Sequence, residues 1–147
     1  MSLTEWLKNG WILEHETSRQ EIGHLLKLID RDLKDCGNAS LSLDWRFNIA
    51  YNAALQSANL ALAASGFRAR GEAHHHRVIH SLEHTIKLEA KRIARFDAFR
   101  KKRNASEYDR AGAVSEKELG EMISFAADIK ELAMAWMLKS HPQLMAD

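Results

Sequence analysis

The sequence predicts an all-α domain built as an antiparallel bundle of four to five helices. Its 147 residues include 39 alanines and leucines, which favour helices, but two valines and three threonines, whose branched side chains favour strands. Apolar residues also recur at helical spacing along several segments. We expect a single domain over residues 1–147, with an N-terminal arm or short helix over 1–16 and the bundle over 17–142.

Two long helices are predicted in the first half of the chain. Ser18 and Glu21 have the spacing of a capping box, and the apolar residues after them predict an amphipathic helix over 18–35. A second helix is predicted over 43–65, where Gly66 would end it. This helix is rich in alanine, and small side chains allow neighbouring helices to approach closely. We therefore expect it at the centre of the bundle.

The middle of the chain predicts a loop and two further helices. The loop covers 68–73, and a third helix starts near His74 and includes Leu82 and Ile86. A fourth helix follows it. The pattern leaves open whether a kink or a short turn near 88–90 separates the third helix from the fourth.

The C-terminal part predicts a polar connection and a last helix. The connection covers 104–114. Ser115 and Glu118 form a second capping-box pattern, and an apolar stripe at helical spacing continues to Trp136. Pro142 would stop this helix.

Composition and charge exclude several classes of protein. The one cysteine, Cys36, cannot form a disulfide within the chain, which excludes a disulfide-rich secreted scaffold, and we expect it to be structural. No apolar run is long enough to span a membrane and no signal-peptide pattern opens the chain, so we expect a cytoplasmic protein without a membrane partner. The net charge is +1, yet residues 68–110 carry 12 basic and 6 acidic side chains. Such a segment forms either an anion-binding face or a solvated helix surface.

Five histidines lie close together in the sequence, at His74, His75, His76, His80 and His84. A spacing of four puts the last three on one helix face, where imidazoles can bind zinc, nickel or copper. No His-Glu-x-x-His motif accompanies them, and the sequence identifies no further ligand. We therefore expect a polar helix face, with no metal and no cofactor.

A basic run, Arg100-Lys101-Lys102-Arg103, ends the predicted fourth helix. Cations at the C-terminus of a helix are stabilised by its dipole, but four in succession exceed what capping needs. Arginine also offers a planar fork that fits phosphate oxygens. The side chains that we expect to contact nucleic acid here are Arg95, Arg100, Lys101 and Lys102.

The run Arg103-Asn104-Ala105-Ser106-Glu107-Tyr108 follows this basic helix and resembles the signature region of the HEPN superfamily. The alanine-rich run 51–56, the loop 66–72 with histidines after it, and His141-Pro142 also resemble small bacterial members. The resemblance covers roughly residues 40–142. It implies an HEPN-like bundle that is usually dimeric. It also implies kinship with metal-independent ribonucleases of toxin–antitoxin and defence modules.

The resemblance assigns catalytic positions to Arg103, Asn104 and Tyr108. In the family, arginine steadies the anionic phosphate while a histidine moves a proton during attack of the ribose 2′-hydroxyl. Tyr108 stands at about the place of that histidine. Imidazole titrates near pH 6.5 and phenol near pH 10, so a tyrosine is a poor base at neutral pH. We therefore expect ribonuclease activity to be weak or absent.

Besides a metal-independent ribonuclease proper, which the resemblance leaves open, two functions follow from the sequence. One is an HEPN-like protein associated with RNA or another nucleic acid in a toxin–antitoxin or defence context. That protein would form a homodimer and have an antitoxin or nucleotidyltransferase partner. The alternative is a non-catalytic dimeric protein-interaction bundle with no nucleic-acid role, in which the basic run is a solvated helix cap.

Overall fold

The computed structural model describes residues 1–71, 74–104 and 112–145, and these residues are mostly helical. In chain order the elements are α1 (Leu3–Lys8), β1 (Ile12–Glu14), α2 (Arg19–Asp35), α3 (Leu43–Ala64), β2 (Phe67–Ala69), α4 (His74–Ser81), α5 (Ala90–Asn104), α6 (Glu116–Ser140) and the 3-10 helix η2 (Pro142–Leu144).

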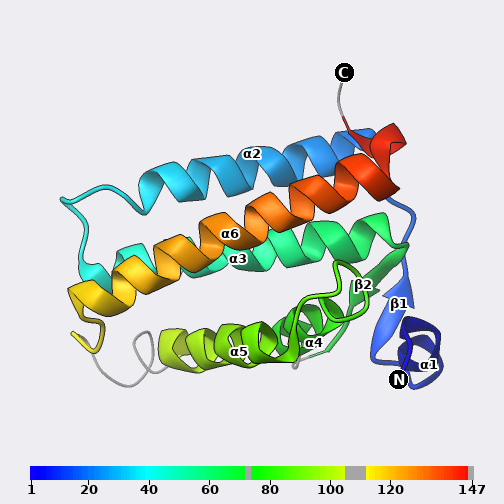
Figure 1. Ribbon diagram of the computed structural model, residues 1–147, viewed down its shortest axis with the longest axis horizontal. Coiled ribbons are helices and arrows are strands. Elements are labelled where there is room, and N and C mark those ends of the chain that lie inside the picture. The colour runs from blue at the N-terminus through cyan, green and yellow to red at the C-terminus, as the bar shows by residue number, and fades with distance from the viewer. Residues whose placement is uncertain (72–73, 105–111, 146–147) are drawn as a thin grey trace.

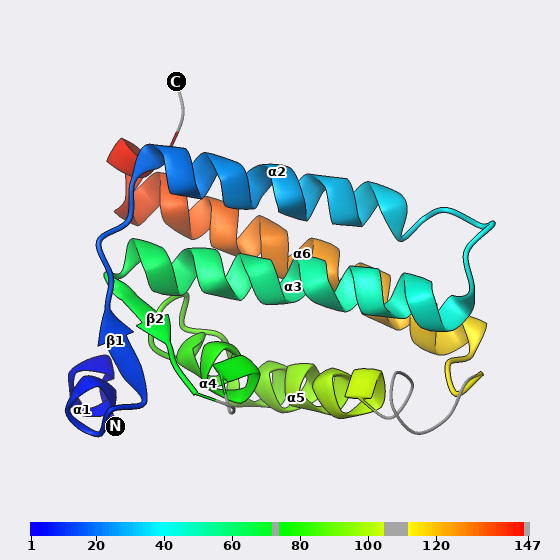
Figure 2. The ribbon, with the colours of Figure 1, turned by 180° about the vertical axis from the view of Figure 1, so that it is seen from behind.

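The helices α2 to α6 form an antiparallel bundle, which confirms the predicted all-α architecture. In chain order, α2, α3, α5 and α6 run in alternating directions, and α4 lies beside α5 (Figure 1). Seen from behind, α3 lies between α2 and the α4–α5 pair (Figure 2). The N-terminal residues form α1 and β1 beside β2 at one end of the bundle. No helix of the described ranges is long and apolar enough to cross a membrane.

The central position of α3 confirms the expectation for the alanine-rich segment. Thirteen of its 22 residues are buried, and it contacts α2, α4, α5 and α6. A helix that is buried on most sides needs small or apolar residues on most sides, and the alanines provide them. The helix ends one residue before the predicted end. Ser65 is its C-cap, and Gly66 follows with a φ of +95° that favours glycine.

Aromatic side chains pack α5 against α3 and α6. The Phe96 ring lies 6.0 Å from the Tyr51 ring of α3 and 5.3 Å from the Phe125 ring of α6. Phe99 makes the same two kinds of contact, at 6.0 Å to Phe47 and 5.2 Å to Phe125. Edge-to-face pairs of this kind add to the free energy of burial. They fix the position of α5, which carries seven of the 12 basic residues in the segment 68–110.

Two short strands occupy segments that the sequence predicted as an arm and a loop. β1 and β2 pair antiparallel, with Leu13 opposite Arg68. The prediction of a loop over 68–73 was therefore wrong for its first two residues. A strand of three residues is too short to show a period of two, and its pairing joins segments far apart in the sequence.

The third predicted helix is shorter than its apolar pattern implied. α4 ends at Ser81, and the Leu82 N–H bonds to the carbonyl three residues back rather than four. Leu82 is fully buried, and Ile86 is half-buried, although both lie outside the helix. The separation from α5 is thus a turn that runs to Glu89, with Lys87 at a φ of +59°. The turn buries its apolar residues toward the core, so their spacing in the sequence resembles that of a helix although the segment is not helical.

Serine caps set the starts of α2 and α6. Ser115 accepts the Glu118 N–H, and the Glu118 side chain accepts the Ser115 N–H, which confirms the second capping box. At Ser18 only the serine half is present. The Glu21 carboxylate instead accepts the Thr17 hydroxyl at 2.6 Å, which lowers the pKa of Glu21.

A larger side chain on the buried surface of α3 should push this helix away from its neighbours and destabilise the fold. Ala58 is fully buried in the core, so we expect Ala58→Leu to lower the free energy of unfolding by about 1–3 kcal/mol. The exposed Ala94 of α5 provides the control, because leucine there should change stability by less than about 0.5 kcal/mol. Urea unfolding followed by circular dichroism measures both. Similar small effects at the two positions would contradict tight packing around α3.

Candidate functional site

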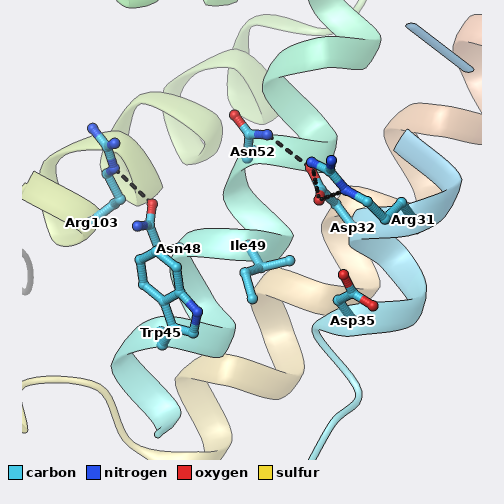
Figure 3. Close-up of a pocket in the computed structure, with 8 residues that line it drawn as sticks. All are labelled: Arg31, Asp32, Asp35, Trp45, Asn48, Ile49, Asn52 and Arg103. Carbon is cyan, nitrogen blue, oxygen red and sulfur yellow. Dashed lines mark hydrogen bonds and ion pairs between the residues drawn. The ribbon is translucent and has the colours of Figure 1, made fainter. Parts of the chain in front are cut away.

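An open pocket of about 480 Å³ between α2, α3 and α5 is the best candidate for a binding site (Figure 3). Its lining consists of Arg31, Asp32, Asp35, Trp45, Asn48, Ile49, Asn52 and Arg103. The α3 members lie three or four residues apart, so they share one face of that helix. α3 forms the floor of the pocket, while α2 and α5 supply charged side chains from opposite sides.

Arg103 is held by groups from α3 and from its own helix. Its Nε donates to Oδ1 of Asn48 at 3.0 Å, and its Nη1 donates to Oδ1 of Asn104 at 3.2 Å. The guanidinium carbon lies 5.6 Å from the centroid of the Tyr51 ring, a cation–π distance. These contacts orient a planar cation at the edge of the pocket.

Asp32 is a buried carboxylate on the opposite side of the pocket, 5% exposed. Its Oδ1 accepts two hydrogen bonds from Arg31, at 3.0 and 3.1 Å. Its Oδ2 accepts the Asn52 amide at 2.8 Å. A buried carboxylate needs such donors to offset its lost hydration. This network therefore holds α2 against α3 at the side of the pocket opposite Arg103.

Trp45 gives the pocket an exposed aromatic surface. Its side chain is 53% exposed although it lies in the first turn of α3, next to the start of an otherwise buried helix. Large apolar side chains with that exposure are few among the described residues. An indole face open to solvent beside polar groups can stack on a planar ligand.

Tyr51 connects the pocket to the histidine segment behind it. Its hydroxyl and Nδ1 of His75 lie 3.2 Å apart. Burial raises the pKa of Tyr51 well above its usual value, and burial also lowers the pKa of His75 to about 4. Charge interactions with His74, Arg103 and Arg100 lower the pKa of His75 further. The imidazole near Arg103 is therefore neutral at pH 7 and a weak base.

Carboxylates pair with all four predicted nucleic-acid-binding cations on α5. Lys102 and Arg95 face α6, where they pair with Glu118 at 3.0 Å and Glu121 at 3.7 Å. Arg100 and Lys101 instead pair with Asp97 of their own helix, at 2.7 and 3.6 Å. The positive charge of the basic run is thus largely balanced within the fold.

The predicted site residues therefore separate into three groups. Arg103 lies at the pocket with Asn104 bonded to it, and Arg95 and Lys102 contact α6. Arg100 and Lys101 form the third group and pair with Asp97 of their own helix. Tyr108 lies outside the described residues.

The sequence analysis missed Trp45, Asn48 and Asp32. A signal was available for the first two, because polar and aromatic side chains at helical spacing interrupt the face of an alanine-rich helix. Asp32 lies within a charged amphipathic helix and carries no comparable signal.

The histidines and Cys36 also take different places. His84 leaves the predicted histidine face because α4 ends before it, and its ring packs 5.3 Å from the Trp6 ring. His76 and His80 remain on one face of α4, with rings 4.2 Å apart. Cys36 is fully buried and donates to the Leu33 carbonyl at 3.2 Å, and burial raises the pKa of its thiol. A buried neutral thiol of this kind suits a structural role.

Comparison with family models, curated proteins and solved structures finds no match to this chain. The resemblance of the Arg103 region to the HEPN superfamily therefore stays a prediction.

The Asp32 network should contribute measurably to stability. We expect Asn52→Ala to lower the free energy of unfolding by about 1–3 kcal/mol, because the buried Asp32 carboxylate loses a donor. Asn59→Ala is the matched control on the same helix, where the lost bond joins two half-buried amides. Urea unfolding measures both variants. Equal losses would argue that Asn52 acts only through helix propensity.

Proposed function

We propose that the protein binds single-stranded RNA at the pocket between α2, α3 and α5, as an HEPN-like bundle of a toxin–antitoxin or defence module. The observation that carries the proposal is that Arg103 and the exposed Trp45 line the same pocket. Proteins that bind single strands combine a cation for the backbone with an aromatic surface for a base. The resemblance adds a homodimer and an antitoxin or nucleotidyltransferase partner to this proposal.

Each side of the pocket suits a different part of a nucleotide. Arg103 presents a guanidinium for a phosphate oxygen, and the Asn48 amide bonded to it fixes its direction. Trp45 offers a face on which a base can stack. Asp35 lies exposed on the α2 side, where a carboxylate can accept hydrogen bonds from the amino groups of a base.

The paired cations of α5 can still attract RNA. Lys101 has a side chain that is 71% exposed and pairs with Asp97 at 3.6 Å, and the Arg95 side chain is 52% exposed. Exposed ion pairs are worth about 0–1 kcal/mol, so a phosphate can compete for such cations. They would steer RNA toward Arg103, and the steering would weaken as salt rises.

The same geometry favours binding over cleavage. Among the described histidines, His75 is linked to Arg103 through the Tyr51 side chain. Its pKa of about 4 makes it a poor proton acceptor at neutral pH. The resemblance places Tyr108 where the family has a histidine, and a phenol, with an ordinary pKa near 10, is a poor base at neutral pH. We therefore expect a protein that holds RNA without cutting it efficiently.

RNA binding should depend on Arg103 and Trp45. We expect Arg103→Ala to weaken binding of a short single-stranded RNA by about 10–100-fold and to reduce the salt slope by about 0.7. Trp45→Ala should cost about 1–3 kcal/mol of stacking, which Trp45→Phe should partly restore. Fluorescence anisotropy at several salt concentrations measures all of these effects.

Arg68→Ala is the matched control, because this arginine is exposed on β2 at the far end of α3. Equal weakening by Arg68→Ala and Arg103→Ala would reduce the interaction to non-specific charge. Absence of RNA binding at low salt would favour the alternative, a protein-interaction bundle with no nucleic-acid role.

Cleavage should respond to the missing histidine. We expect little cleavage by the natural chain in the presence of a chelator. Tyr108→His should raise the rate, by up to about 10²–10⁴-fold, because imidazole transfers protons at neutral pH. Addition of Arg103→Ala to that variant should abolish the gain. Rapid cleavage by the natural chain would contradict binding without cleavage, and equal, negligible rates in the natural chain and in Tyr108→His would contradict the match at Tyr108.

A further inference from the structure

A second cluster of polar side chains lies where α4 packs against α5. His76 and His80 sit one turn apart on α4, and Asp97 of α5 faces them, with its Oδ1 3.5 Å from Nδ1 of His76. One ligand atom from each of the three side chains lies within 4.8 Å of the others. The sequence suggested the histidine pair but gave no third ligand, because Asp97 is brought to the pair by packing.

His80 has an unusual lack of hydrogen bonding. Its Nε2 is buried and has no partner, which holds for no other buried side-chain nitrogen or oxygen among the described residues. A buried polar atom without a partner costs free energy, and coordination of a cation would offset that cost.

We propose that His76, His80 and Asp97 bind a zinc-class divalent cation that links α4 to α5. The site is separate from the RNA proposal, because none of its three ligands lines the pocket at Arg103. A set of two imidazoles and one carboxylate binds Zn²⁺ in preference to the harder cations Mg²⁺ and Ca²⁺.

The geometry fits the cation after a small adjustment. Ligand atoms around tetrahedral zinc lie about 3.4 Å apart, given bonds of about 2.0–2.1 Å. Rotation of the His76 side chain, which is 43% exposed, would close the observed spread of up to 4.8 Å. Three protein ligands leave a fourth position for water, as in zinc sites that remain open.

Arg100 competes with the cation for the same carboxylate. Its Nε donates to Oδ1 of Asp97 at 2.7 Å, while Nζ of Lys101 lies 3.6 Å from Oδ2. Burial acts to raise the pKa of Asp97, but the bonds and charges of Arg100 and His76 outweigh it and hold that pKa below its usual value. The carboxylate is therefore ionised and able to bind a cation, and Arg100 limits how tightly.

The test uses the full chain without a histidine tag, first freed of metal by a chelator. Zinc is titrated by calorimetry, and cobalt absorption reports tetrahedral coordination by nitrogen and oxygen ligands. We expect a single zinc equivalent to bind and to raise the Tm. His76→Ala and Asp97→Asn should each weaken binding by more than about tenfold, and Arg100→Gln should tighten it. His24→Ala is the control, an exposed histidine on α2.

The variants are chosen so that each result decides the proposal. His76 and Asp97 lie outside the hydrophobic core, and circular dichroism verifies that each variant is folded. Loss of zinc binding in both, with His24→Ala unchanged, supports the site. No zinc binding by the natural chain, retained binding in either variant, an equal loss in His24→Ala, or no tightening in Arg100→Gln would overturn it.

Discussion

The position of α5 depends on three apolar side chains, and both proposed sites depend on the position of α5. Ile93, Phe96 and Phe99 are its buried residues, in a helix that is otherwise polar. Their burial against α3 and α6 supplies the free energy that holds so many charges at the surface of the bundle. The same packing brings Arg103 to Asn48 and Asp97 to His76. A change in the docking of α5 would therefore alter the two sites together.

The central helix α3 explains why the pocket is placed where it is. Its alanines let α2 and α6 approach closely over most of its length, so a long polar side chain there fits best at a gap between helices. Asn48 and Asn52 do so, and each bonds to a charged residue of a different helix. Their position makes α3 both the core of the bundle and the floor of the pocket.

The sequence predicted the parts of the fold that depend on local chemistry. Serine caps and apolar spacing identified α2 and α6 nearly to the residue, and alanine content with Gly66 as a stop identified α3, because those signals act within a few positions of the chain. The prediction failed where contacts between distant segments decide the structure. The pairing of β1 with β2 and the end of α4 at Ser81 are examples. For the candidate sites, Arg103 was found from the sequence, whereas its partner Asn48 and the third ligand Asp97 required the packing.

The charge of the basic segment shows why sequence position and surface potential are different quantities. Residues 68–110 carry a large excess of cations, but the segment that follows in the chain is acidic, and α6 lays Glu118 and Glu121 against Lys102 and Arg95. Much of this excess positive charge is therefore neutralised within the bundle, where it contributes to the attraction between α5 and α6. A specific anion site cannot arise from the total charge of such a helix. Such a site depends on the direction in which a cationic side chain points. Arg103 differs from the other cations of the run because it points at α3, beside an amide and an exposed indole.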